Sequence, residues 1–156
     1  MKQILILLLF SGYTVSLDTQ TQNQDINEEE ILTVITVYYK DFSDRNWEKF
    51  SKHFWDRATL TTVWQPSDED SPRVISVTVP EFVEQAHLGP DSKPIFEEKM
   101  TNAEVRVYKI LAHVWAHYDA RFGDPGNITE WKGIDAFTLI KHEGKWKITS
   151  LAYTDL

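Results

Sequence analysis

The first half of the chain carries hydrophobic residues at helical spacing. The residues that recur on one face of the first predicted helix are Ile31, Val34, Ile35, Tyr38 and Tyr39. Asn27 can cap this helix, and the three glutamates that follow it favour the positive end of the helix dipole. The pattern therefore predicts an amphipathic helix that begins at Asn27 and stops near residues 41–43.

Shorter elements are predicted before residue 90. β-Branched residues indicate strands, and proline suits the first turn of a helix. In chain order these elements are a short helix with Trp47, Phe50 and Phe54 on its apolar side, a strand at 59–64, a polar loop at 65–73, a strand at 74–79, and a helix from Pro80 that carries Phe82, Val83 and Ala86 and ends at Gly89–Pro90.

The second half of the chain alternates between hydrophobic and polar residues, which is the period of a β-strand. The alternation runs from Tyr108 to Phe122, and residues 103–107 alternate in the opposite phase. Such a phase change requires a hairpin or a bulge near Tyr108. Two more strands are predicted at 131–141 and 145–155, after a loop at 123–129 and on either side of a tight turn at 142–144.

This order of elements predicts an α+β fold. Three N-terminal helices should pack on one face of a curved antiparallel sheet, because each helix and the sheet have one hydrophobic face to bury. A sheet that curves around helices leaves a cone-shaped cavity between them. No repeat and no second domain are visible, so the folded domain is predicted to cover residues 28–156.

Local motifs in the second half resemble the nuclear transport factor 2-like (NTF2-like) superfamily, and more narrowly its SnoaL-like or "putative lumazine-binding" branch. They are the segments 112–118 (AHVWAHY), 133–139 (GIDAFTL) and 144–148 (GKWKI), with 44–47 (DRNW) at the end of the first helix. The likeness covers residues 28–155 and implies the cone-shaped fold. It does not imply one activity, because the superfamily includes isomerases, cyclases, dehydratases and non-catalytic binding domains.

The N-terminus has the pattern of a secretory signal peptide. Lys2 precedes an apolar run at residues 4–10, and Thr14 and Ser16 fit the small-residue positions before a cleavage site. We therefore expect residues 1–16 to be removed and the protein to be secreted or periplasmic. A buried N-terminal strand is the alternative for this run. Residues 17–27 are polar without periodicity and are expected to form a flexible lead-in.

Composition and charge exclude several classes of function. The 156 residues include 24 acidic and 16 basic side chains, and the net charge is −8. This balance argues against nucleic acid as a partner and against an anionic membrane after signal removal. Cysteine is absent, which excludes disulfides, thiolate metal sites and a lipidated N-terminal cysteine.

Asp135 is the candidate for chemistry. It alternates with Gly133, Phe137 and Leu139, so it is expected on the inner face of its strand. Burial would raise its pKa, and the group could then act as a general base or acid near neutral pH. Gly133 would leave room for a ligand beside it. The alternative is a structural aspartate that a tyrosine hydroxyl or a backbone N–H satisfies.

Other residues are candidates for the cavity wall or for a catalytic pair. His87 could pair with Asp135 as base and orienting group. The residues expected to contact a ligand, besides Asp135, are Tyr39, Trp55, Trp64, Phe82, Tyr118 and Phe137. Each of these aromatic residues could equally be part of the hydrophobic core.

Neither a metal nor a cofactor is predicted. His113 and His117 have a spacing that suits zinc on a helix, but on a strand the two residues lie about 13 Å apart. Phosphate-binding and nucleophile motifs are also absent from the sequence.

The outer face of the predicted sheet suggests a homodimer interface, because interfaces are enriched in aromatic residues. The residues that should point outward there are Trp115, Ile134, Ala136 and Ile140.

The sequence thus leaves three hypotheses for function. The first is an exported domain that binds a small, mostly apolar molecule without catalysis. The second is a cofactor-free isomerase, cyclase or dehydratase that uses Asp135 as general base. The third is an assembly module that acts through the outer sheet face. An acid–base enzyme needs at least two suitable groups in one cavity, and the sequence identifies only one carboxylate there, which favours the first hypothesis.

Overall fold

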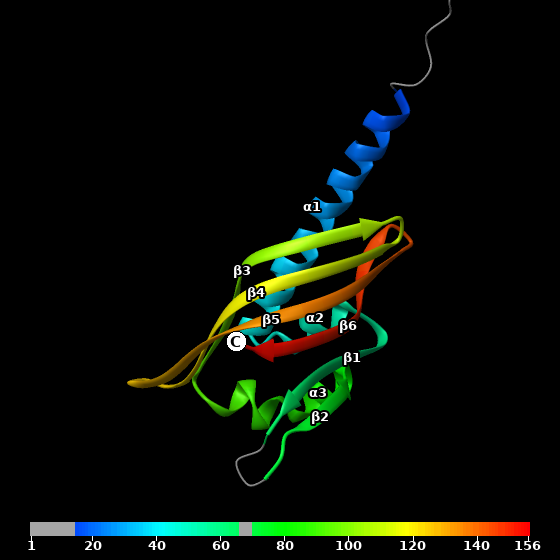
Figure 1. Ribbon diagram of the computed structural model, residues 1–156. Helices are drawn as coiled ribbons and strands as arrows, with labels where there is room; N and C mark the ends of the chain where they lie inside the picture. The colour runs from blue at the N-terminus through cyan, green and yellow to red at the C-terminus, as the bar shows by residue number, and fades with distance from the viewer. Residues whose placement is uncertain (1–14, 66–69) are drawn as a thin grey trace, which may run out of the picture.

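The computed structural model describes residues 15–65 and 70–156 and has an α+β architecture (Figure 1). Helices pack on one face of a curved six-stranded sheet, as the alternation and helical spacing predict. The elements are α1 (Val15–Ser43), α2 (Trp47–Lys52), β1 (Phe54–Trp64), β2 (Arg73–Thr78), α3 (Val79–Gln85), short 3₁₀ helices at Ala86–Leu88 and Pro90–Ser92, β3 (Ile95–Tyr108), β4 (Leu111–Asp124), β5 (Asn127–His142) and β6 (Lys145–Asp155).

The sheet is mixed, so the prediction of an entirely antiparallel sheet is wrong in one pairing. The strand order is β2-β1-β6-β5-β4-β3, and β1 runs parallel to β6 while all other neighbours are antiparallel. Hydrophobic periodicity locates strands but carries no information on which distant strands pair. The pairing of β1 with β6, the last strand of the chain, joins two segments that are far apart in the sequence, so periodicity could not predict it.

Three α-helices are present, but they do not all precede the sheet. Strands β1 and β2 come before α3, and α2 has only six residues. Asn46 caps α2, because its side chain accepts a hydrogen bond from the backbone N–H of Lys49. Phe54, which was predicted on the second helix, begins β1 instead, and it is still buried in the core.

Helix α1 already includes Val15, the first residue that the structure describes, so the prediction that it starts at Asn27 is wrong. Residues 17–27 are helical, and the flexibility expected of this segment stays a prediction. No glycine or proline interrupts this polar segment, and the helix can therefore continue beyond the region that it buries. Figure 1 shows this early part of α1 extending away from the sheet. Asn27 lies inside the helix, where its side chain accepts a hydrogen bond from Lys141 at 2.8 Å.

The predicted signal peptide falls mostly on residues 1–14, which lie outside the described residues. Its cleavage therefore stays a prediction. Within the described part of the chain, no helix is both long enough and apolar enough to cross a membrane.

Two hairpins differ in detail from the sequence pattern. The phase change near Tyr108 is a hairpin between β3 and β4, and not a bulge, which was the other alternative. Lys109 lies in the turn of this hairpin with a φ of 56°. Glycine and asparagine adopt this conformation more easily and are the usual turn residues, so a lysine at this position gives no turn signal in the sequence. The loop predicted at 123–129 is shorter, because β4 continues to Asp124 and β5 begins at Asn127.

The two faces of the sheet have different environments. The inner face of β4 and β5 is buried against α1, and the ring centroids of Tyr38 and Phe137 lie 5.1 Å apart there. On the outer face, Trp115 pairs with Ala136 across the strands and is 46% exposed. The predicted outward orientation of Trp115 is therefore correct, while the homodimer inferred from it stays a prediction.

Candidate functional site

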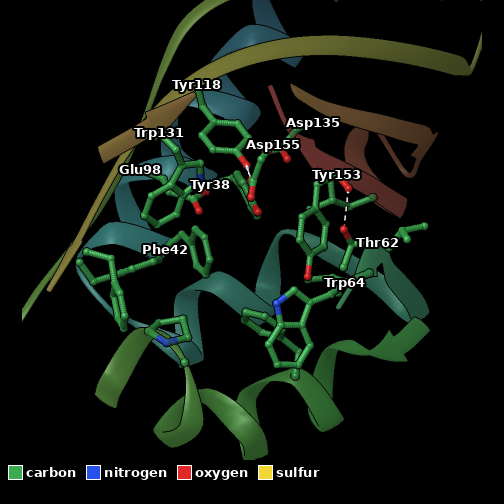
Figure 2. A pocket seen from close by; sticks show the side chains of 18 residues that line it. Tyr38, Phe42, Thr62, Trp64, Glu98, Tyr118, Trp131, Asp135, Tyr153 and Asp155 are labelled. Carbon is green, nitrogen blue, oxygen red and sulfur yellow. Dashed lines mark hydrogen bonds between the residues drawn. The ribbon is translucent and has the colours of Figure 1, made fainter. Parts of the chain in front are cut away.

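A cavity of about 390 Å³ lies between the inner face of the sheet and the helices (Figure 2). Helix α1 contributes Tyr38 and Phe42 to its wall, and α3 contributes Phe82. The volume is within the range of small-molecule sites in proteins. The residues that line the cavity are Tyr38, Phe42, Leu60, Thr62, Val63, Trp64, Phe82, Gly89, Pro90, Phe96, Glu98, Tyr118, Phe122, Trp131, Asp135, Leu151, Tyr153 and Asp155.

Strand register brings the polar lining residues together. Directly paired residues of neighbouring strands point to the same face of a sheet. Tyr118 on β4 pairs with Gly133 on β5, which in turn pairs with Asp155 on β6. Asp135 pairs with Tyr153 in the same way, so these side chains meet over the inner face.

Asp135 is buried, as the alternation of its strand predicts. Its side chain accepts a hydrogen bond from the Tyr39 hydroxyl at 2.6 Å, and the residue is only 3% exposed. Removal from water raises the pKa of Asp135 to about 7, although the hydrogen bond from Tyr39 acts in the opposite direction. Near neutral pH the group can therefore either give up or take up a proton.

Glu98 is a second carboxyl group in the cavity that the sequence analysis missed. Burial raises its pKa well above the usual range, and the negative charges of Asp135 and Asp155 raise it further. Thr101 is an extra residue in β3, between the Met100–Tyr118 and Asn102–His117 pairs. This bulge reverses the alternation, so Glu98 faces inward although the phase of residues 103–107 would place Glu97 there.

Asp155 is the third carboxyl group, and it was missed for a similar reason. Thr149 is an extra residue in β6, between the Leu139–Ile148 and Thr138–Ser150 pairs. The phase of Trp146 and Ile148 therefore does not continue to the end of the strand. The Tyr118 hydroxyl donates to Asp155 over 3.4 Å, as Figure 2 shows.

The hydroxyl groups of the cavity are held in their protonated form. Burial raises the pKa of Tyr153 to about 12, and the charges of Glu98 and Asp135 add to this effect. The pKa of Tyr118 is also raised, first by burial and then by Glu98, Asp135 and Asp155. Both phenols are therefore available as hydrogen-bond donors at neutral pH.

The structure brings four of the predicted site residues into the cavity wall. These are Asp135, Trp64, Phe82 and Tyr118. Tyr39 and Phe137 lie behind this wall, within the buried core. Tyr39 supports the wall through its hydrogen bond to Asp135 and its ring contacts with Tyr38 and Tyr118, and Phe137 packs against Tyr38 and Tyr39.

Trp55 and His87 lie outside the lining of the cavity, so the structure does not place them where the sequence analysis expected them. Trp55 lies in the irregular part of β1, is 44% exposed and packs against the His142 ring. His87 is exposed on the 3₁₀ turn after α3, and its Nδ1 lies 2.8 Å from the carbonyl oxygen of Glu84. The predicted pair of His87 with Asp135 is therefore not formed, because the helical turn directs the ring away from the cavity.

Gly133 does not leave room for a ligand, contrary to the expectation. A Cβ atom at this position would lie 2.2 Å from the ring of Tyr118. The absence of a side chain thus makes space for Tyr118 itself, which forms part of the cavity wall.

The two histidines of β4 lie on a strand, as predicted, and not on a helix. His113 is exposed and its Nδ1 lies 3.3 Å from the Thr138 hydroxyl. Across residues 15–65 and 70–156, no group of three or more histidine or acidic side chains is arranged to hold a metal ion.

Comparison with solved structures places this architecture among known folds. An NTF2-like protein with a cystatin-like fold from Novosphingobium aromaticivorans is 13% identical with a TM-score of 0.72, over 93% of this chain and 92% of that one. The chain has the NTF2-like fold. No known family profile matches the sequence, and no curated protein matches it.

Two further solved structures carry names that refer to an activity. One is a "putative scytalone dehydratase" from N. aromaticivorans, which is 14% identical with a TM-score of 0.69 over 87% of this chain and 88% of that one. The other is a "putative dehydratase from the NTF2-like family" from Streptomyces avermitilis, which is 16% identical with a TM-score of 0.67, over 85% of this chain and 98% of that one. At these identities the likeness concerns the fold alone.

Proposed function

We propose that this protein binds a small, mostly apolar molecule in the cavity in a non-catalytic role. The observation that carries the proposal is the cavity of about 390 Å³ with aromatic walls and a few convergent polar groups. Cavities of this size and lining are typical of small-molecule sites. The residues that would contact the ligand are Trp64, Phe82, Tyr118 and Asp135 from the sequence prediction, together with Glu98, Tyr153 and Asp155.

Native mass spectrometry of protein purified from its own host tests the proposal directly, because a retained molecule appears as a mass difference. Binding of N-phenylnaphthylamine, which fluoresces in apolar pockets, provides a second measurement. Trp64→Ala should weaken binding of this probe, because Trp64 lines the cavity. Trp55→Ala is the matched control, since Trp55 lies on the same strand and is similarly exposed, but outside the cavity. Equal effects of the two variants would contradict the proposal.

A second candidate is a cofactor-free isomerase, cyclase or dehydratase of the SnoaL-like type, with Asp135 as general base. It is favoured by the pKa of about 7 of Asp135 and by Glu98 in the same cavity, whose raised pKa would suit a general acid. The names of the two dehydratase-like structures are consistent with it. If the retained molecule exchanges a carbon-bound hydrogen with D₂O on the protein, and Asp135→Asn abolishes exchange while binding remains, this candidate replaces the first.

Export and a homodimer complete the proposal. Export rests on the signal-like pattern of residues 1–16, and the homodimer rests on the exposed position of Trp115 on the outer sheet face. The binding role does not depend on either.

A further inference from the structure

The charged groups in the lining of the cavity are all acidic. Three carboxyl groups line it, from Glu98, Asp135 and Asp155, and its lining contains no lysine, arginine or histidine. The cation next to the site is Arg45, whose guanidinium lies 5.8 Å from the centre of the Phe96 ring. Arg45 is engaged elsewhere, because it donates to the Lys93 carbonyl at 2.7 Å and pairs with Asp91.

Hydrogen bonds satisfy these carboxyl groups only in part. Asp135 receives one from Tyr39 at 2.6 Å, and Asp155 receives a long one from Tyr118 at 3.4 Å. The side chain of Glu98 is half-buried and faces the cavity, and no described residue donates a hydrogen bond to its carboxyl group. A ligand group that carries positive charge and N–H donors would therefore complement three carboxyl groups that the protein itself pairs only in part.

The rest of the cavity wall suits a cation with an apolar body. Aromatic rings attract cations through their negative faces, and this attraction is strongest where water is excluded. Figure 2 shows Phe42 and Trp64 on the side of the cavity away from Asp135 and Asp155. Phe82, Phe96 and Trp131 add three more rings to the lining.

The arrangement favours an organic cation over the other ligand charges. The described carboxyl groups do not converge in a way that could hold a metal ion, whereas an ammonium on an apolar skeleton can fill an aromatic cavity. An anionic ligand would be repelled by the carboxyl groups of the cavity lining when they are ionised. A neutral ligand would leave Glu98 protonated and would gain nothing from its ionisation.

We propose that the ligand of this cavity is an organic amine, protonated or quaternary, whose ammonium group lies between Glu98 and Asp135 and whose apolar part contacts the aromatic wall. This inference rests on the proposed binding function and specifies the ligand class for the same site. The ammonium would replace the missing partner of Glu98, and the ionised form of both carboxyl groups would then be the bound form.

Three probes of one shape test the charge separately from binding as such. Phenylbutylamine, phenylbutanol and phenylbutanoate share a phenyl ring and chain and carry a positive, no or a negative charge. Displacement of N-phenylnaphthylamine at about pH 8 should show that the amine binds about tenfold or more tightly than the alcohol, and that the carboxylate binds least. If the alcohol binds as tightly as the amine, the amine inference is overturned and the binding function stands. If none of the three probes binds and the dye does not bind either, the amine inference and the proposed binding function are both overturned.

A pair of adjacent variants assigns the effect to Glu98. Glu98→Gln should reduce the affinity for the amine to about that for the alcohol and leave the alcohol unchanged. Glu97→Gln is the matched control, because Glu97 is on the outer face of the same strand, 3.5 Å from Arg121. Equal amine affinity in Glu98→Gln and the wild-type protein would overturn the inference.

The pH dependence of binding is an independent readout that needs no variant. Affinity for the amine should rise as the pH passes through about 7, where Asp135 loses its proton, while affinity for the alcohol should not. The groups that face Asp135 and Glu98 are Tyr38 and Tyr39 from α1, Tyr118 from β4, and Tyr153 and Asp155 from β6. The phenols remain protonated in this range. An amine affinity that falls with rising pH would overturn the inference.

Discussion

Asp135→Asn should make the folded protein more stable at alkaline pH while leaving its structure unchanged. The side chain keeps its shape, and its amide oxygen can accept the same hydrogen bond from Tyr39. What the substitution removes is the possibility of a buried negative charge, next to Glu98 and without a cation in the cavity lining. The difference between variant and wild type should therefore depend on pH.

The size and sign of this difference follow from the pKa of Asp135. Its value in the folded protein is about 7, against an ordinary value of 3.8, so the folded state holds the proton more tightly than the unfolded state. The corresponding stability is fully present below about pH 4 and is lost as the pH rises through 7. Since each pKa unit corresponds to about 1.4 kcal/mol, the wild-type protein loses up to about 4 kcal/mol through this group. Asp135→Asn avoids that loss.

Urea unfolding of both proteins at about pH 4, 6 and 8 measures the effect. The stability of the two should be within about 1 kcal/mol at the lowest pH and should diverge in favour of Asp135→Asn at the highest. Tyr39→Phe serves as a second variant, because removing the hydrogen bond that lowers the pKa should make the loss of stability continue to higher pH than in the wild-type protein. Parallel pH profiles, or an Asp135→Asn protein less stable by about 1–3 kcal/mol at pH 8, would show that an ionised structural aspartate is required.

Three further predictions concern other parts of the chain. Gly133→Ala should lower the free energy of unfolding by about 1–3 kcal/mol and displace the Tyr118 ring, since the new Cβ would lie 2.2 Å from it; an unfolding midpoint equal to wild type would contradict this. Trp115→Glu should convert a dimer into a folded monomer in sedimentation experiments, and a monomeric wild-type protein at tens of micromolar would refute the interface. N-terminal sequencing of material from the native host should find a protein that begins near Leu17; a retained Met1 in the cytoplasmic fraction would exclude cleavage.

The sequence by itself determined the features that depend on local periodicity. Helical spacing identified the buried face of α1, with Ile31, Ile35 and Tyr38 in the core. Alternation identified β4 and β5 and placed Asp135 on the inner face with Phe137. These predictions are confirmed because a regular helix or strand fixes the direction of every side chain relative to its neighbours.

Local patterns did not determine where helix α1 begins or which residues reach the cavity from irregular segments. Helix α1 extends N-terminal to Asn27 because the polar residues there are compatible with a helix that continues beyond the core, and amphipathic spacing gives no signal for it. Trp55 and His87 were assigned to the cavity from their elements alone. The irregular start of β1 and the turn after α3 direct them elsewhere.

The tertiary structure decided the composition of the site. One extra residue in a strand moves all following side chains to the other face, and Thr101 and Thr149 are such residues. Their bulges are defined by pairing with neighbouring strands, so no pattern within β3 or β6 alone reveals them. Because of them, Glu98 and Asp155 join Asp135 in one cavity, and a site with a single predicted carboxylate becomes one with three.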